Sequence, residues 1–187
     1  MSDSNLSLRD RLVDCALALL EQGESDVSLR AVARAAGVSA MAPYRHFEDK
    51  AALMGAVALK GFAMLEAGAA RANEADDTRE ALEAQGVAYV GFARAHPALF
   101  RLMFADGAGL ALPHEDCRGA YTLMARNVAE LAPHCVEAGV LACWGLVHGL
   151  ATLALDGRIP ADPAGERAAI ALITYALKAA PPALAGS

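Results

Sequence analysis

One segment of the sequence, from Ala138 to Leu155, runs for 18 residues without a charged side chain. A run of this length is on the threshold for a helix that crosses a membrane, and in a water-soluble protein it has to be covered by other parts of the structure. The acidic residues Glu137 and Asp156 bound it, so no basic residue anchors it at a membrane surface. It also contains His148 and three glycines, which lipid does not favour. We therefore expect a helix that packs against protein, with no contact to a membrane.

The composition favours helices throughout the chain. Alanine accounts for 45 of the 187 residues, whereas Val, Ile and Thr together account for only 18. Alanine is the strongest helix former, and β-branched residues are those that strands prefer. Hydrophobic residues make up 56% of the chain, which excludes a disordered protein. We expect an all-α protein.

Small residues follow one face of the uncharged segment. They recur at spacings of 4, 3, 4 and 3, at Ala138, Ala142, Gly145, Gly149 and Thr152. A stripe of small side chains lets a second helix approach closely. We expect this helix and a final helix at residues 162–179 to form a four-helix bundle with the same helices of a second subunit, giving a homodimer.

Apolar periodicity, capping residues and prolines predict the other helices. Two short ones flank a glycine turn: the first has Ser28 as its N-cap and ends at Gly37, and the second spans residues 40–46 with Ser39 as its cap. Pro43 lies inside the second and is expected to tighten or bend its first turn. Further helices are predicted at residues 7–22, 47–72, 78–95, 97–105, 115–131, 135–155 and 162–179, with a loop at 106–113.

Two short helices joined by a tight glycine turn are typical of a helix-turn-helix. The charge distribution agrees with this interpretation. Residues 28–60 carry a net charge of +3, whereas residues 61–187 carry −5, within a chain whose overall charge is −6. A small basic segment next to an acidic body indicates a DNA-contacting module on a scaffold that does not touch DNA.

The segment AVARAAGVSAMAPYRHFEDKAAL, followed by a long helix, resembles the DNA-binding domain of the tetracycline-repressor (TetR) family of transcriptional regulators. Its most specific part is Gly37-Val38-Ser39, then Tyr44-x-His46-Phe47, then Lys50. Towards the C-terminus, HPALFRLMF and WGLVHGL resemble the Trp-His-Gly type of ligand-binding domain in that family. The resemblance implies a helix-turn-helix domain at residues 1–50 and a ligand-binding and dimerisation domain at 51–187.

The resemblance also implies which residues contact DNA. Phosphates would be bound by Ser28, Ala42, Tyr44, His46 and Lys50, and bases would face Arg30, Ala40, Met41 and Arg45; Ser39 caps the recognition helix and can also contact a phosphate. Alanine and methionine cannot form paired hydrogen bonds with bases and can only pack against thymine methyl groups. The two arginines are therefore the side chains left to read a guanine, and part of the specificity has to come from DNA shape.

A small-molecule effector is the second partner that the family implies. The lining residues that we expect are Phe62, Phe92, Met103, Tyr121, Met124, Trp144 and His148, within a wider set that adds Leu65, Tyr89, Phe100 and Phe104. This lining suits an apolar or aromatic effector with few polar groups. Effector binding would displace the two recognition helices from successive major grooves of a palindromic operator, roughly 34–36 Å apart.

Two other interpretations remain open. The four cysteines, Cys15, Cys117, Cys135 and Cys143, lie with His134 and His148 on apolar stretches and allow a thiol- or metal-responsive regulator of the same fold. An enzyme is disfavoured because the sequence contains no GxGxxG, GxSxG, GxxxxGK[ST] or HExxH motif, and His114–Cys117 fits a loop-to-helix junction. We expect no catalytic site, no cofactor and no metal ion. The polar opening of the sequence has no secretory-signal pattern, so we expect a cytoplasmic protein.

Overall fold

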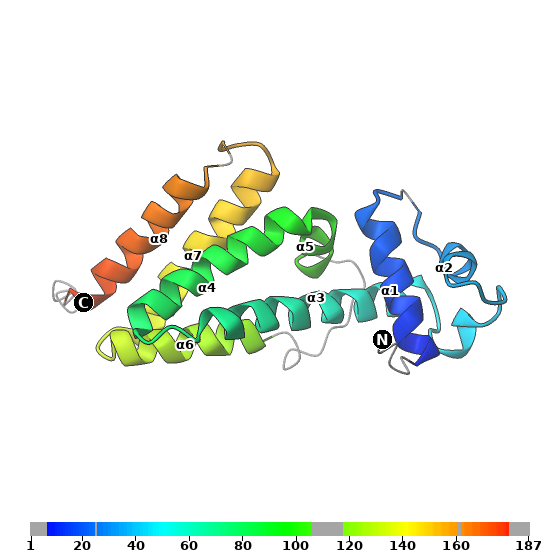
Figure 1. Ribbon diagram of the computed structural model, residues 1–187, viewed down its shortest axis with the longest axis horizontal. Coiled ribbons are helices and arrows are strands. Elements are labelled where there is room, and N and C mark those ends of the chain that lie inside the picture. The colour runs from blue at the N-terminus through cyan, green and yellow to red at the C-terminus, as the bar shows by residue number, and fades with distance from the viewer. Residues whose placement is uncertain (1–6, 25, 106–117, 161, 180–187) are drawn as a thin grey trace, which may run out of the picture. The chain divides into compact units, whose positions relative to one another are not determined.

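The structure is a computed structural model that describes residues 7–24, 26–105, 118–160 and 162–179. The described part contains α-helices and one 3₁₀ helix and no β-strand (Figure 1), which confirms the predicted all-α class. The helices are α1 (Leu8–Glu21), α2 (Leu29–Ala35), η1 (Pro43–Arg45), α3 (Lys50–Ala72), α4 (Thr78–Ala95), α5 (Pro97–Met103), α6 (Gly119–Leu131), α7 (Val136–Leu155) and α8 (Pro163–Lys178). The loop expected at 106–113 and the helix start expected at Glu115 lie outside the described residues.

Side chains at the helix ends explain where several helices begin. The Ser28 hydroxyl accepts a hydrogen bond from the amide of Ala31 at 3.3 Å, so Ser28 is the N-cap of α2 as predicted. Asp49 accepts from the amide of Ala52 at 2.8 Å and caps α3 in the same way. These bonds satisfy backbone donors that have no partner within the helix. Gly37 follows α2 with a φ of +68°, a backbone conformation that favours glycine.

The described residues belong to two compact units, divided within α3. The N-terminal unit consists of Met1–Phe62 and His96–Cys117, and the C-terminal unit of Ala63–Ala95 and Arg118–Ser187. The division therefore does not coincide with the functional boundary expected at residue 50/51. Helix α5 belongs to the N-terminal unit, where it packs against α1. The Nδ1 atom of His96 lies 2.9 Å from a carboxylate oxygen of Glu21 and joins the two segments.

The core of the N-terminal unit is built from fully buried aliphatic side chains of four helices: Leu12, Val32, Leu53, Val57 and Leu99. Phe47 and Val32 also belong to this core, with exposed fractions of 3% and 0%. Helix α5 approaches α3 closely at Gly61, where an added Cβ atom would lie 2.5 Å from Sδ of Met103. A larger residue at this position would force the side chains of Met103 and Leu99 to shift.

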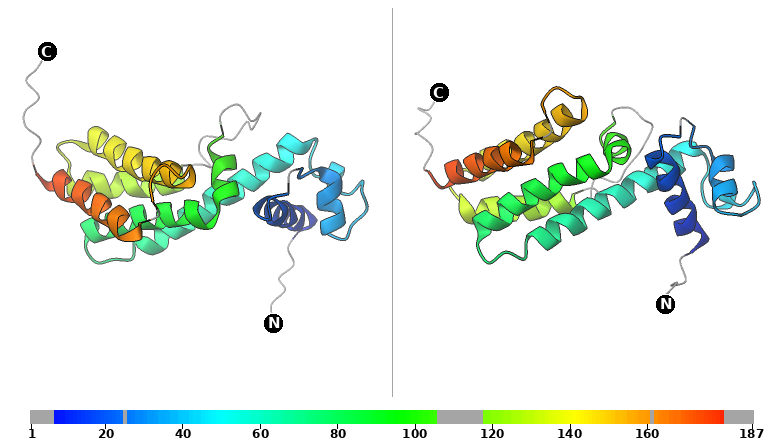
Figure 2. Two further views of the ribbon diagram at one scale, coloured as in Figure 1. Left: turned by 90° about the horizontal axis from the view of Figure 1, so that it is seen from above. Right: turned by 45° about the horizontal axis from the view of Figure 1, so that its top comes forward.

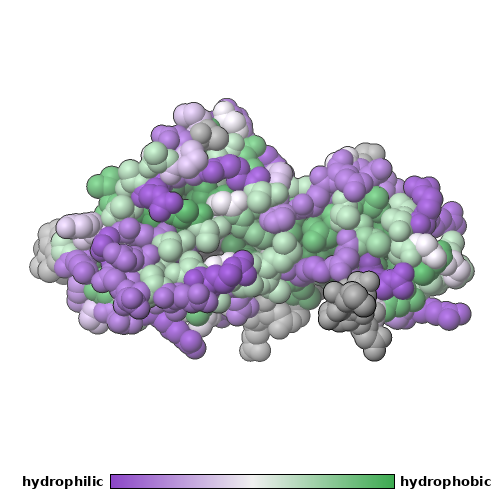
Figure 3. Space-filling model, in the orientation of Figure 1, coloured by the Kyte–Doolittle hydropathy of each residue, from purple (hydrophilic) through white to green (hydrophobic). Residues whose placement is uncertain are grey.

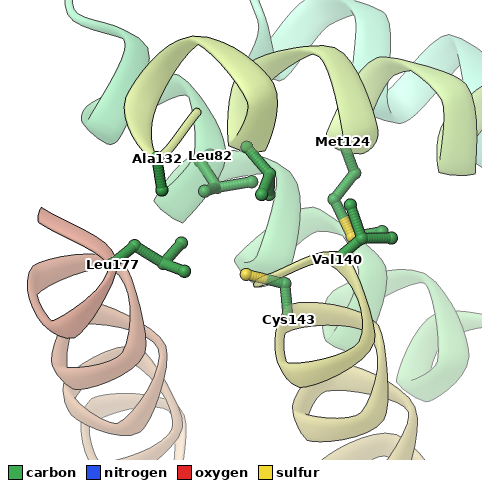
Figure 4. Close-up of a cluster of buried hydrophobic side chains, with 7 residues drawn as sticks. Leu82, Met124, Ala132, Val140, Cys143 and Leu177 are labelled. Carbon is green, nitrogen blue, oxygen red and sulfur yellow. The ribbon is translucent and has the colours of Figure 1, made fainter. Parts of the chain in front are cut away.

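The C-terminal unit is a helical bundle in which α4 packs against α6, α7 and α8. Helices α7 and α8 lie side by side in both views of Figure 2. Figure 4 shows a buried cluster in which side chains of α4, α6, α7 and α8 point towards one another. The cluster consists of Leu82, Met124, Val128, Ala132, Val140, Cys143 and Leu177. This cluster joins all four helices.

Helix α7, which contains the uncharged segment, is buried on one face only. Its buried residues are Gly139, Val140, Cys143, Val147 and Ala151. On the other face, Leu141 is 68% exposed and Leu153 is 44% exposed. By length and composition both α7 and α3 could cross a membrane. The buried face of α7 packs against α4, α6 and α8.

Candidate DNA interface and effector site

The segment expected to form an α-helical recognition element is shorter and tighter than predicted. Only Pro43–Arg45 is helical, and it is a 3₁₀ helix whose N-cap position, Ala42, has no side-chain capping bond. In an α-helix the amide of residue 43 would donate to the carbonyl of Ser39, but proline has no amide hydrogen. The amide of Ala42 donates to Ser39 at 2.9 Å instead. The predicted third α-helix and its Ser39 cap are therefore wrong, and Pro43 is the reason.

The residues expected to face bases lie at the surface. Met41 is 66% exposed, and Ala40, Arg30 and Arg45 are also exposed. This exposure leaves the Met41 side chain accessible to a partner, next to the turn that contains Pro43.

The residues expected to bind phosphates are also accessible. Tyr44 is 45% exposed, and Ser39, His46 and Lys50 are exposed, whereas Ser28 and Ala42 are half-buried. The Ser28 hydroxyl oxygen accepts from Ala31, and its own hydrogen can still be donated to a phosphate. Figure 3 shows hydrophilic and hydrophobic residues mixed on the surface of the N-terminal unit.

Lys50 has a partner that was not expected from the sequence. Its Nζ atom lies 2.7 Å from Oδ1 of Asp26, in the loop that precedes α2. The two residues are 24 positions apart, so only the fold brings them together. The sequence shows that Asp26 places a negative charge two residues before the cap Ser28. It does not indicate that this charge pairs with Lys50.

In the C-terminal unit, three of the expected effector-binding residues gather around Tyr89. The hydroxyl of Tyr89 lies 2.9 Å from Nδ1 of His148, and it accepts a hydrogen bond from Trp144. The ring of Trp144 contacts that of Tyr121 edge to face, with centroids 5.8 Å apart, and lies 6.0 Å from that of His148. Helices α4, α6 and α7 thus bring two phenols, an indole and an imidazole into one aromatic cluster.

Burial determines the protonation of the polar groups in this cluster. It raises the pKa of Tyr89 far above its usual value, against a smaller opposite effect of the hydrogen bond from Trp144. It lowers the pKa of His148 below its usual value. The phenol therefore stays protonated and the imidazole stays neutral near pH 7. The neutral imidazole and the phenol share this hydrogen bond, and the imidazole tautomer decides which of the two donates.

Of the other predicted effector residues, Met124 belongs to the buried cluster against which Tyr121 packs. Phe62 and Met103 belong to the N-terminal unit, where the ring of Phe62 contacts that of Phe104 edge to face at a centroid distance of 5.5 Å. Met124 is 9% exposed and belongs to the buried cluster of Figure 4. Phe92 is half-buried on α4. Contact of these residues with an effector stays a prediction.

The cysteines and histidines do not gather into a metal site in the described part of the chain, where no group of three His, Cys, Asp or Glu side chains could hold an ion. Cys143 is buried, which raises the pKa of its thiol to about 11 and lowers its reactivity. Cys15 and Cys135 are half-buried. Cys117, with the neighbouring residues 114–116, lies outside the described residues.

Comparisons with known families identify the fold. Residues 82–176 match the tetracyclin repressor-like C-terminal domain. Residues 12–57 match the bacterial regulatory proteins of the tetR family. The chain belongs to the TetR family. It is thus a DNA-binding transcriptional regulator, and the family membership predicted from the helix-turn-helix motif is confirmed. The first match contains Trp144, His148 and Gly149, and the second contains every residue from Ser28 to Lys50 that was expected to contact DNA.

Solved structures agree with this membership of the TetR family. A protein of unknown function from Rhodococcus sp. RHA1 is 33% identical, with a TM-score of 0.75, over 95% of this chain and 97% of that one. The regulator PfmR from Thermus thermophilus, a TetR family protein, is 25% identical with a TM-score of 0.60, over 90% and 96%. The fatty acid degradation regulator FadR from Bacillus halodurans shares the fold at 17% identity, with a TM-score of 0.70 over 94% and 96%. No curated protein matches the sequence.

Proposed function

We propose that this TetR family protein is a homodimeric, ligand-responsive repressor, released from a palindromic operator by a small apolar or aromatic effector. Residues 1–50 bind DNA, and residues 51–187 bind the effector and form the dimer. The protein acts in the cytoplasm without contacting a membrane and performs no catalysis. The DNA contacts are those expected from the family motif, from Ser28 to Lys50.

The exposed apolar face of α7 and α8 carries this proposal. Five large hydrophobic side chains of these helices are at least 40% exposed: Leu141, Trp144, Leu153, Leu172 and Tyr175. Figure 3 shows hydrophobic residues among hydrophilic ones over α8. Apolar residues concentrated on two adjacent helices are typical of an interface between subunits. Gly145 and Gly149 support this face as the contact, since a Cβ atom added at either would meet nothing within 4 Å.

A dimer sets the distance between the two helix-turn-helix modules that bind DNA. One helix-turn-helix reads only a few base pairs, whereas two related by a two-fold axis read two half-sites about one helical turn apart. The operator of a dimer is then an inverted repeat. We propose that the effector binds a form of the dimer in which the two modules do not match this spacing. Effector binding then releases the operator, as expected for a repressor.

The aromatic cluster around Tyr89 supports an effector of limited polarity. Tyr121 and His148 are half-buried and Trp144 is 40% exposed, so the cluster is only partly covered by this chain. Its rings offer apolar surface, and its phenol and imidazole offer one or two hydrogen bonds. The raised pKa of the Cys143 thiol argues against Cys143 as the reactive group of a thiol-responsive regulator.

Selection of bound duplexes from a random DNA pool, with the full-length protein, tests this function. We expect an inverted repeat whose half-site centres are about 10 base pairs, or a multiple of that, apart. Trp144 is the single tryptophan of the chain, so its fluorescence reports effector binding directly. Titration with 1-naphthol and with 1-octanol as probes, followed by operator binding, tests release. A probe that binds the dimer and leaves operator affinity unchanged would contradict the proposed mechanism.

A further inference from the structure

The ion pair between Asp26 and Lys50 occupies the place where a DNA phosphate is expected. Lys50 is the first residue of α3, so its ammonium group lies at a helix N-terminus, which attracts anions. In the structure the oxygen within hydrogen-bond distance of that ammonium group is Oδ1 of Asp26, at 2.7 Å. A carboxylate oxygen and a phosphate oxygen are both anionic acceptors of the same hydrogen bond.

The backbone fixes Asp26 at this position. Val27 is 4% exposed and anchors the loop in the core of the N-terminal unit. The amide of Ser28 donates to the carbonyl of Asp26 at 3.0 Å and closes a tight turn before α2. Asp26 therefore lies beside Lys50 and two residues before Ser28, which are two of the residues expected to bind phosphates.

The negative charge of Asp26 opposes the binding of DNA phosphates at Lys50 and at Ser28. Its side chain is 71% exposed and that of Lys50 is 53% exposed, so the pair faces solvent and is weak. A phosphate that approached Lys50 would have to displace this carboxylate or be repelled by it. The alternative is that Asp26 orients Lys50 for DNA binding. In that case its own negative charge would still lie next to the phosphates that Lys50 binds.

We propose that Asp26 is an intramolecular competitor of the DNA phosphate at Lys50 and lowers the affinity of this protein for all DNA, whatever the sequence. This inference rests on the proposed contact between Lys50 and a phosphate. Because phosphate contacts carry no direct sequence information, the competition lowers operator binding and random-sequence binding by the same factor.

Fluorescence anisotropy of the full-length protein on the selected operator and on a scrambled duplex, over a range of salt concentrations, tests this proposal. Asp26→Asn is expected to tighten binding to both duplexes by about two- to fivefold, the range for loss of an exposed ion pair. It should also steepen the dependence of log K on log salt by up to about 0.9. Lys50→Ala should weaken binding to both duplexes equally. In the Lys50→Ala background Asp26→Asn should bring a smaller gain, because only its repulsion of the phosphate expected at Ser28 remains.

Glu24→Gln is the matched control, since it removes the same charge from the same loop. Glu24 is exposed, and among the described residues its carboxylate forms no ion pair. A gain from Glu24→Gln equal to that from Asp26→Asn would assign the effect to net charge and overturn the proposal. Weaker binding of Asp26→Asn would also overturn it, because Asp26 would then orient Lys50.

The same variants separate this inference from the proposed DNA contact. If Lys50→Ala weakens binding and Asp26→Asn changes nothing, the competition fails while the phosphate contact of Lys50 stands. If Lys50→Ala leaves affinity unchanged on both duplexes, the phosphate contact fails and the competition with it. Circular dichroism and thermal unfolding of each variant confirm that the comparison is between folded proteins.

Discussion

The hydroxyl oxygen of Tyr89 on α4 lies 2.9 Å from Nδ1 of His148 on α7. The two residues are 59 positions apart and join the two helices that pack most extensively in the C-terminal unit. The bond is partly buried, so its loss cannot be fully compensated by water. The Tyr89–His148 bond therefore stabilises the unit and orients the imidazole ring in the aromatic cluster.

Replacement of Tyr89 by Phe removes this hydroxyl and keeps the ring. We expect Tyr89→Phe to lower the free energy of unfolding by about 1 kcal/mol, the usual contribution of one such hydrogen bond. For a protein of this size the loss corresponds to a fall in Tm of roughly 2–4 °C. Tyr44→Phe, measured without DNA, is the control, because Tyr44 is 45% exposed and lies in the N-terminal unit. An equal fall in both variants would contradict the assignment.

The stability of the protein should depend on pH through His148. Burial holds the pKa of His148 below its usual value of 6.5 in the folded protein. As the pH falls through about 6.5, the unfolded chain takes up a proton at this residue that the folded chain does not yet bind. Stability is therefore lost on acidification from that pH downwards. Urea unfolding at pH 7.5 and pH 5.5 should show a smaller loss for His148→Gln than for the native protein, and an identical loss would exclude this role.

Two glycines on opposite faces of α7 are expected to respond oppositely to alanine. At Gly139 an added Cβ atom would lie 2.8 Å from Val128 and 2.9 Å from Leu177, both in the buried cluster of Figure 4. Gly139→Ala should cost about 1–3 kcal/mol, because the core has no room for it. Gly145 has nothing within 4 Å, so Gly145→Ala should stabilise the isolated subunit by up to about 1 kcal/mol through helix propensity.

Chemical denaturation at low protein concentration measures the free energies of unfolding of Gly139→Ala and Gly145→Ala. At concentrations that favour the dimer, the proposed approach of a second subunit along Gly145 should reverse the benefit of Gly145→Ala. A variant that is stabilised equally at all concentrations would show that this face of α7 is not the contact.

Local sequence signals predicted the elements of this fold well. Capping residues such as Ser28 and turn glycines such as Gly37 act through neighbouring backbone groups, so their effect can be read from a few residues. The helix at residues 40–46 was predicted from Ser39 as a cap after the glycine turn at Gly37. This prediction was wrong in extent, because Pro43 removes the amide that would form the first α-helical hydrogen bond.

The candidate sites could be predicted only in part. The helix-turn-helix motif occupies contiguous residues, and its family pattern names the DNA contacts directly. The partners of those residues, such as Asp26 beside Lys50 and Tyr89 beside His148, come from distant parts of the chain. Which of many apolar residues line a site and which fill the core is also decided by packing, as Met124 in the buried cluster illustrates.

The dimer proposed through α7 and α8 predicts the effect of a charge on the exposed face. Leu172 is 73% exposed on α8, so Leu172→Glu leaves the core of the subunit intact. Between two subunits the buried carboxylate would lack a partner, and we expect dissociation to monomers in light scattering with unchanged helical content. Ala129→Glu, at an exposed position on α6, introduces the same charge away from this face. A variant Leu172→Glu that stays dimeric would contradict the interface.

The base contact proposed for Arg30 predicts a loss that depends on sequence. Arg30 is exposed in α2, directly after Leu29, which anchors the helix in the core. Arg30→Ala should cost about 1–3 kcal/mol of operator binding and relax the preference at one base pair. Arg34→Ala is the matched control, since Arg34 is exposed on the same helix and we assign it no base contact. Repeating the selection from a random pool with each variant measures the preference position by position. Equal losses for Arg30→Ala on operator and scrambled duplexes would mean that Arg30 binds the backbone and reads no base.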